Sequence, residues 1–343
     1  MTDAAVATVV IPTHNRLHLL AAAIGSVLQQ VGVSLEVVVV DDGSTDGTGP
    51  WLDRLAAEDR RIKVVHHQRP QFMSAARNAG IARASARWVA FCDDDDLWAP
   101  DKLVAQLRAL DSAAARWACT GVIVVNERLE IVGHHHARGG DVLSGLLEEN
   151  LIPSGSSVIA DLQLVQQLGG FDPSLHGSED WDFWIRLAQH SPLAPVDRPL
   201  IAYRLGTASM SMDIDRMRTG RATIVKRYAG LALERGVPSN EARHERYLAK
   251  QLLRAGSRRR AASIFASLAL KHRRWRELPR VAAALLAPRW TDRLGMARWA
   301  ATMPAGWQRE AEAWLRPLRS RNQRRPLDHR AKRQSKRQEY RIQ

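Results

Sequence analysis

Four consecutive aspartates, Asp93 to Asp96, directly follow the apolar run 88–92, and this junction constrains the fold more than any other stretch of the chain. The apolar run is typical of a buried β-strand, which would deliver all four carboxylates to its C-terminal end. Clustered carboxylates repel one another unless a counter-charge lies near them, and Mg²⁺ or Mn²⁺ prefers such oxygen ligands. The run alone fits a metal site, a solvated acidic turn or a calcium loop.

The first half of the chain alternates strand and helix patterns. Short apolar runs indicate buried strands, the segments between them have helical periodicity, and Ser74 is a candidate N-cap. The expected strands are 7–11, 35–40, 62–65 and 88–92, and the expected helices are 17–30, 46–58, 74–84 and one that begins near Pro100. This alternation predicts an α/β fold, with a Rossmann-like, mostly parallel sheet covered by helices on both faces.

Polar clusters follow three of the expected strands. They are residues 12–15, 41–44 and 93–96. In sheets of this kind ligands bind outside the carboxyl ends of the strands. All three clusters should therefore lie together at one edge of the sheet and form the binding site.

The remaining sequence is less regular. Segments 117–125 and 129–133 read as a hairpin-like pair of strands, and strand patterns are absent after about Asp215. The adjacent residues His134, His135 and His136 would point to opposite faces of a strand, so an exposed loop rather than one metal site is expected there. The predicted domains are an α/β domain at 1–215, a helical appendage at 216–315 and a basic tail, expected to be disordered, at 316–343.

The positive charge is unevenly placed. From Arg316 to the end there are eleven Lys and Arg against Asp328 and Glu339, which gives +9 of the total +14. A basic region can bind nucleic acid, but the stacking aromatics of a nucleic-acid reader are missing here. Attraction to an anionic membrane surface fits as well, with Trp275, Trp290 and Trp299 at the interface, and so does a solubilising tail.

The sequence gives further indications of compartment. Cys92 and Cys119 lie in apolar runs without metal-type spacing, which favours buried free thiols in a reducing environment. Residues 1–7 lack the pattern of a signal peptide, and no uninterrupted apolar stretch is long enough to span a membrane. A cytoplasmic protein is expected, with possible peripheral attachment to the cytoplasmic face of the membrane.

Five motifs occur in an order and at a spacing that resemble family 2 glycosyltransferases of the GT-A fold, a group within the nucleotide-diphospho-sugar transferases. The resemblance covers roughly residues 7 to 210. The motifs are Val9–Arg16 (VVIPTHNR), Val39–Thr48 (VVDDGSTDGT), Ala76–Gly80 (ARNAG), Phe91–Trp98 (FCDDDDLW), and Gly169–Asp172 (GGFD) followed by Ser178–Asp182 (SEDWD).

The resemblance implies roles for the aspartate run. Asp95 aligns with the family's metal ligand, for Mn²⁺ or Mg²⁺, and Asp94 or Asp93 would hold the ribose hydroxyls of the donor. A metal on the diphosphate would stabilise the leaving group as a Lewis acid. Asp96 is the candidate for a bland role, as a cap of the helix near Pro100. The register within the run is open by one residue.

The resemblance also implies a nucleotide site. Asp42 matches the position that accepts a hydrogen bond from a uracil ring, although its motif could also be a simple turn. Pro12, Thr13, His14 and Asn15 would wrap the base. Arg77 would approach the diphosphate; an arginine on a helix is otherwise a common surface ion-pair partner.

Asp180 corresponds to the catalytic base of the family. Inverting transfer needs one carboxylate to take the proton from the acceptor hydroxyl. Ser178 is a candidate N-cap that would place Glu179 and Asp180 in a first helical turn, where acids also complement the helix dipole. Glu179 and Trp181 are acceptor-site candidates, with core packing as the alternative for Trp181 and the preferred one for Trp184. The segment 203–211 resembles the family's region behind the base, and a loop there is expected to fold over the donor when it binds.

These features predict an inverting, metal-dependent glycosyltransferase of the hexosyltransferase type. It would move a sugar from a nucleotide-diphosphate donor, with UDP favoured by Asp42, to a hydroxyl of a glycan or lipid-linked acceptor in cell-surface polysaccharide synthesis. A nucleotidyltransferase or sugar-nucleotide pyrophosphorylase would usually carry a glycine- and arginine-rich loop after the first strand, whereas residues 12–16 read PTHNR. A nucleic-acid-binding protein would line the ligand edge with basic residues, and that edge is acidic. An inactive scaffold is disfavoured by the retained acidic motifs.

Overall fold

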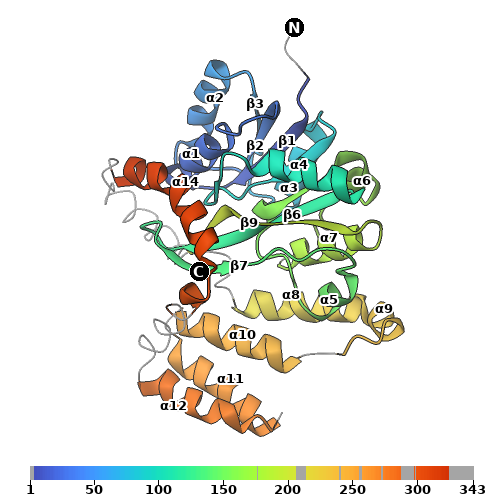
Figure 1. The fold of residues 1–343 in the computed structure, drawn as a ribbon, viewed down its shortest axis with the longest axis vertical. Coiled ribbons are helices and arrows are strands. Elements are labelled where there is room, and N and C mark those ends of the chain that lie inside the picture. The colour runs from blue at the N-terminus through green and yellow to red at the C-terminus, as the bar shows by residue number, and fades with distance from the viewer. Residues whose placement is uncertain are drawn as a thin grey trace.

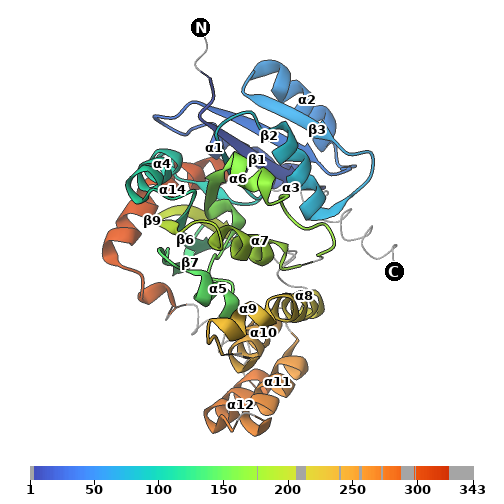
Figure 2. The same ribbon diagram turned by 90° about the vertical axis from the view of Figure 1, so that its right-hand side faces the viewer.

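The computed structural model describes residues 4–175, 177–205, 214–238, 241–254, 257–271, 273–286, 297 and 299–323. Within these ranges the chain forms a nine-stranded sheet covered by helices on both faces, followed by a helical part that extends away from the sheet (Figures 1 and 2).

The sheet combines parallel and antiparallel pairings. Its strand order is β3-β2-β1-β4-β8-β6-β9-β5, with β7 paired to β6. The β3-β2-β1-β4 half is parallel, as predicted, whereas β8 runs antiparallel between β4 and β6. The strands are β1 (Ala7–Thr13), β2 (Leu35–Asp41), β3 (Ile62–His66), β4 (Trp88–Phe91), β5 (Leu97–Trp98), β6 (Trp117–Val125), β7 (Ile131–His135), β8 (Val158–Asp161) and β9 (Leu193–Arg204).

Alternating side chains of the strands feed two cores, one on each face of the sheet. On β1, Val9 and Ile11 pack with helices α1, α2 and α4, whereas Val10 packs on the other side with α3 and α5 to α7. This two-sided burial explains why the strands read as continuous apolar runs. The helices of this part are α1 (Leu17–Val27), α2 (Thr48–Glu58), α3 (Phe72–Arg83), α4 (Lys102–Ala113), α5 (Leu143–Glu148), α6 (Leu162–Gln167) and α7 (Glu179–Ala188).

The strand register brings the predicted polar clusters to one edge. Thr13 at the end of β1 pairs with Asp41 at the end of β2. Val10 pairs with Phe91, so the turn after β4 lies beside the last residues of β1. The topological prediction of one shared edge is therefore confirmed by the pairing itself.

Some local predictions were wrong. Helix α3 begins at Phe72 with Gln71 as its N-cap residue, so Ser74 is a buried helical residue and not a cap. His134 and His135 belong to strand β7 and not to an exposed loop. The predicted alternation of faces holds there, because His134 and His136 contact Trp307 whereas His135 contacts Trp299.

The later helices divide between two packing sites. Helices α10 (Glu241–Arg254), α11 (Arg258–Lys271) and α12 (Leu278–Leu286) share a core of their own, joined by Met217 of α8 (Ile214–Arg227). Short helix α9 (Ala229–Glu234) follows α8. By contrast, α14 (Ala305–Gln323) returns to the sheet, where Ala311 and Leu315 are buried against β6 and β9.

Helix α14 crosses the domain boundary predicted at residue 315. Residues 316–323 are helical, and residues 324–343 of the expected tail lie outside the described residues. We retain as a proposal that the α/β domain ends near residue 215, with α14 as a later addition to its sheet. Among the described residues, no helix combines the length and apolarity needed to cross a membrane.

Trp307 should be the main contact that holds α14 on the sheet. Its ring lies against His136 and so close to Gly121 that a Cβ there would overlap it, and its Nε1 donates to the Asp197 carbonyl at 3.2 Å. We expect Trp307→Ala to lower the free energy of unfolding by about 3 kcal/mol, the usual cost of emptying a buried tryptophan site. The measurement is urea unfolding, with Trp275→Ala, which removes an exposed indole, as the control. Equal losses for the two variants would contradict this role of Trp307.

Candidate functional site

The four aspartates alternate between an inward and an outward pair. Asp94 and Asp96 are buried, at 6% and 0% exposure, whereas Asp93 and Asp95 remain partly open to solvent. The run leaves β4 in a turn at the ligand edge of the sheet. Only the outward pair is therefore placed to meet a ligand.

The inward pair is fixed by hydrogen bonds to distant segments. Thr13 Oγ1 donates to Asp94 at 2.8 Å. Ser154 Oγ and the Arg204 backbone N–H donate to the two oxygens of Asp96 at 2.9 and 3.3 Å. Helix α4 has Asp101 as its N-cap residue, so the predicted capping role of Asp96 is wrong. Asp96 instead ties the turn to β9 and to the segment before β8.

Arginines neutralise much of the negative charge of the run. Arg16 Nη1 lies 3.1 Å from Asp94 and 2.9 Å from Asp95, and Arg204 Nε donates to the Asp95 carbonyl at 3.2 Å. Burial nevertheless raises the pKa of Asp94 to about 7, with Arg16 opposing that rise and Asp95 adding to it. The site thus holds more carboxylates than its nearby cations fully compensate.

Arg77 is buried and is not a surface ion-pair partner. Its guanidinium lies 2.9 Å from Asp93 and 3.5 Å from Glu179, and it stacks over the Phe171 ring at 5.0 Å. Arg77 therefore links the turn after β4 to the first turn of α7. This link brings the predicted nucleotide and catalytic motifs together.

The loop after β1 meets the loop after β2. His14 is exposed and its Nδ1 is 2.7 Å from the Asp42 carbonyl oxygen. Asn15, in a left-handed conformation (φ 54°), accepts from the Thr45 N–H at 2.7 Å. Pro12 and Thr13 are buried residues of β1. The four predicted base-wrapping residues thus continue from the strand into this junction.

The Asp42 carboxylate is already engaged in the structure. It accepts from the backbone N–H groups of Gln71 and Phe72 at 2.8 and 2.9 Å, and His67 Nδ1 lies 2.7 Å from it. A carboxylate offers about four acceptor positions, so one further donor can still bind. Asp42 therefore orders the segment before α3 and retains limited acceptor capacity.

Asp180 sits at the start of α7, facing the aspartate run. Its oxygens accept from the Trp181 N–H at 2.7 Å and from Asn150 Nδ2 at 3.3 Å. Burial raises the pKa of Asp180 to about 6, Glu179 acts in the same direction, and Arg77 opposes both. A carboxylate with this pKa is suited to accept a proton near neutral pH.

Two predictions about this helix are corrected. Trp181 is 4% exposed and its Nε1 donates to the Leu146 carbonyl at 2.6 Å, so it is a core residue and cannot stack on an acceptor. Ser178 occupies the N-cap position in a left-handed conformation, but its side chain makes no capping hydrogen bond. The preferred core position of Trp184 is confirmed, and Glu179 is buried beside Arg77.

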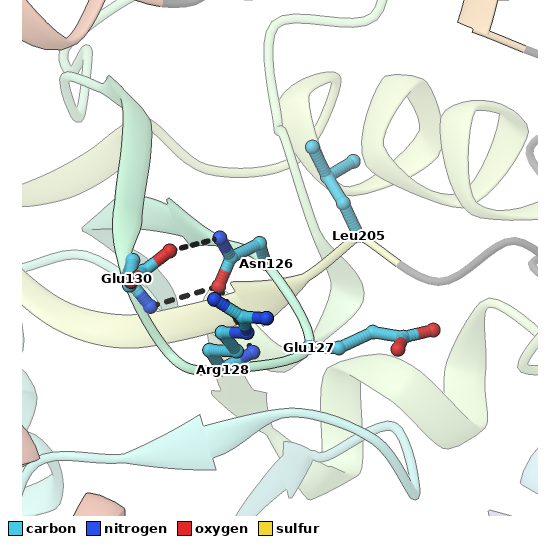
Figure 3. A pocket seen from close by; sticks show the side chains of 5 residues that line it. All are labelled: Asn126, Glu127, Arg128, Glu130 and Leu205. Carbon is cyan, nitrogen blue, oxygen red and sulfur yellow. Dashed lines mark hydrogen bonds between the residues drawn. The ribbon is translucent and has the colours of Figure 1, made fainter.

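A shallow surface depression lies at the tip of the β6–β7 hairpin (Figure 3). Asn126 and Glu130 hydrogen-bond across it, and Leu205 closes one side. Burial lowers the pKa of Arg204, the residue before Leu205, and the negative charge of Glu127 is one of those that oppose this lowering.

Sequence reasoning did not assign several residues that shape the site. Arg16 and Arg204 pair with the aspartate run, Ser154 holds Asp96, and Asn150 contacts Asp180. The acidic run itself predicts nearby cations, and Arg16 follows the neighbouring strand by only three residues. No comparable signal marks Asn150 or Ser154, because their contacts depend on the path of the segment before β8. Of the predicted closing segment 203–211, Tyr203 and Arg204 end strand β9, and residues 206–211 lie outside the described residues.

Comparison with known proteins matches residues 8–159 to the family described as glycosyl transferase family 2. An uncharacterized glycosyltransferase of Rickettsia conorii is 30% identical over 63% of this chain, but the match spans only 36% of that relative. The putative teichuronic acid biosynthesis glycosyltransferase TuaG of Bacillus subtilis is 29% identical over 60% of this chain and 81% of its own length. Escherichia coli WfgD, named a UDP-Glc:alpha-D-GlcNAc-diphosphoundecaprenol beta-1,3-glucosyltransferase, is 28% identical over 60% and 79%.

Solved structures of TarS from S. aureus share the fold. One aligns with 94% of this chain and 53% of TarS at a TM-score of 0.51 and 19% identity. A complex of TarS 1–349 with UDP-GlcNAc aligns with 86% of this chain and 89% of that one at 0.52 and 17% identity. The α/β sheet with added C-terminal helices is therefore the GT-A arrangement, as the sequence predicted.

Removing the Arg77 guanidinium should destabilise the site strongly. The variant Arg77→Met leaves Asp93 and Glu179 without their shared cation, and breaking a buried ion pair in this way costs about 3 kcal/mol. Arg83→Met, on the exposed side of the same helix, is the matched control and should change stability by less than about 0.5 kcal/mol. Urea unfolding of both variants makes the comparison. Similar stabilities would show that Arg77 does not hold the two acids together.

Proposed function

We propose that this chain, whose residues 8–159 match the model of glycosyl transferase family 2, is an inverting, metal-dependent glycosyltransferase of the hexosyltransferase type. It moves a sugar from a nucleotide-diphosphate donor to a hydroxyl of a glycan or lipid-linked acceptor. The observation that carries this proposal is the outward pair Asp93 and Asp95, which shares one site with the Asp180 carboxylate through Arg77.

The names of the relatives support a role in cell-surface polysaccharide synthesis. TuaG is named for teichuronic acid, ExoO of Rhizobium meliloti for succinoglycan, and WfgD for a UDP-glucose donor and a diphosphoundecaprenol-linked acceptor. We extend the general role to this chain. UDP is the proposed nucleotide because the remaining acceptor position of Asp42 suits a ring N–H, which uracil has and cytosine lacks.

The residues present fit a divalent cation. Asp93 and Asp95 offer hard oxygen ligands that are partly open to solvent. In the described part of the chain no group of three His, Cys, Asp or Glu side chains is arranged to hold a metal ion, so phosphate oxygens and water would have to complete its coordination. Mg²⁺ commonly takes one or two carboxylates and completes its shell with substrate phosphates and water. We propose Asp95 as the ligand of Mn²⁺ or Mg²⁺, which when bound supplies Lewis-acid stabilisation of the leaving diphosphate.

The two candidates for binding the ribose hydroxyls, Asp93 and Asp94, differ in how accessible their carboxylates are. Asp94 is enclosed by Thr13 and Arg16, so Asp93 is the better placed of the two candidates to bind the ribose hydroxyls. Arg16 is partly exposed at this edge and can approach a diphosphate, whereas Arg77 is buried and holds Asp93 and Glu179 in place. Pro12, Thr13, His14 and Asn15 form the side of the site against which the base would lie.

Asp180 carries out the proton transfer. Its ionised carboxylate accepts the proton of the acceptor hydroxyl while that oxygen attacks the anomeric carbon, and the bond between this carbon and the diphosphate breaks with the electron pair leaving on the phosphate oxygen. A single displacement from the face opposite the leaving group inverts the configuration. Asn150 and the Trp181 N–H hold the carboxylate in place, and Glu179 raises its basicity.

A donor screen tests the function. Purified protein is incubated with common nucleotide sugars, with and without Mn²⁺ or Mg²⁺, and released nucleoside diphosphate is measured. We expect metal-dependent release from at least one donor, with UDP-sugars preferred. Absence of metal-dependent binding or turnover with every donor would contradict the proposed activity.

Asp180→Asn should abolish transfer while donor binding stays nearly intact. Loss of a general base typically costs about 10² to 10⁴ in rate. In the wild type, kcat/KM should rise with pH through about 6, because the folded-state pKa of Asp180 is raised and only the ionised form above that pKa can accept a proton. Asp141→Asn, at an exposed acid before α5, is the control and should keep both rate and pH profile. A full rate in Asp180→Asn would assign the base elsewhere.

A further inference from the structure

Helix α12 presents an apolar stripe to solvent. Leu278, Leu285 and Leu286 lie on one side of the helix, at i, i+7 and i+8, and Trp275 stands on the short turn of 3₁₀-helix directly before it. Their exposures are 48%, 46%, 85% and 57% respectively. The opposite side of α12 is used for folding, since Ala284 is buried in the core of the α10–α12 unit. The stripe is therefore surplus to the packing of this unit.

The stripe is bordered by positive charge. Lys271, Arg273, Arg274 and Arg276 precede it, and the described part of the chain provides no ion-pair partner for any of them. The only acidic residue in the sequence of residues 271–286 is Glu277, which is buried and paired with Arg246 and Arg280. The surface around the stripe therefore carries an uncompensated positive charge.

The position of α12 leaves the stripe accessible. Both views place α11 and α12 at the end of the molecule that is farthest from the N-terminus, with α10 between them and the rest of the chain (Figures 1 and 2). Leu270, near the end of α11, adds a further side chain at 66% exposure. Trp299, which the sequence suggested as an interfacial residue, instead packs against His135 and Gly133, and Trp290 lies outside the described residues.

We propose that the apolar stripe of α12 and its bordering cations form a docking surface for an anionic lipid bilayer. A helix that places leucines and tryptophan on one side and arginines beside them lies in the membrane interface, with the apolar side toward the acyl chains. Each cation near an anionic surface strengthens the attraction to it. This binding is independent of the proposed transferase activity.

A second copy of the chain is a poorer occupant. A symmetric contact through the stripe would bring two equal sets of cations together without acids to pair them, which opposes association. A bilayer supplies both apolar chains and negative headgroups. The charge pattern thus favours lipid over self-association.

The full-length protein is tested by flotation with vesicles of phosphatidylcholine alone or mixed with phosphatidylglycerol. We expect binding to the mixed vesicles, and about tenfold weaker binding for Leu285→Ser/Leu286→Ser. Leu233→Ser, at an exposed leucine of α9, should bind like wild type. Arg273→Gln/Arg276→Gln should weaken binding about thirtyfold, whereas Arg54→Gln/Arg108→Gln, with the same loss of charge on α2 and α4, should not.

Circular dichroism and light scattering decide the remaining outcomes. A wild-type protein that fails to float, or stripe variants that float like wild type while folded, would overturn the proposal and leave any lipid binding to other basic regions. A wild-type dimer that the stripe substitutions convert to a monomer would identify a self-association surface instead. Stripe variants that remain folded and monomeric but lose flotation would support the membrane-docking proposal.

Discussion

The structure depends on the partial neutralisation of the adjacent carboxylates at the end of β4, where arginines pair with Asp93, Asp94 and Asp95. Arg16 pairs with Asp94 and Asp95 from the loop after β1, and Arg77 pairs with Asp93 from α3. Without such cations, burial and mutual repulsion would disfavour ionised carboxylates in this turn. The same pairing brings three separate parts of the chain to one place, because Arg77 also reaches Glu179 beside the proposed base. The ion pairs that offset the negative charge of this turn are therefore also the contacts that bring the parts of the site together.

The alternation within the run separates structural from functional roles. Asp94 and Asp96 point inward, and their carboxylate oxygens accept hydrogen bonds from Thr13, Ser154 and the backbone of β9. Asp93 and Asp95 point outward and keep oxygens for a ligand. A turn built in this way is held rigidly by its inner carboxylates while its outer ones stay in position, which is the preorganisation that charge stabilisation in a transferase requires.

The sequence predicted those parts that depend on local patterns. Apolar periodicity located β1 to β4 and their shared edge, because β1, β2 and β4 are buried on both faces and β3 places Ile62 in the core. It did not locate the antiparallel insertion of β8, the return of α14 to the sheet or the burial of Trp181, which depend on contacts between distant segments. A capping role for Asp96 was predicted from its position near Pro100, but its carboxylate instead accepts a hydrogen bond from Ser154, which is 58 residues away in the sequence. Helix signals in residues 216–315 likewise did not reveal which faces stay exposed.

The central claim is that Asp95 binds the metal at the donor site while Asp96 remains structural. It is tested most directly by a crystal structure with Mn²⁺ and UDP, in which anomalous scattering locates the manganese. The account predicts a manganese peak coordinated by the Asp95 carboxylate and the UDP phosphates, with Asp96 still bonded to Ser154. A peak on Asp96, or manganese and nucleotide bound away from the ends of β1, β2 and β4, would contradict it.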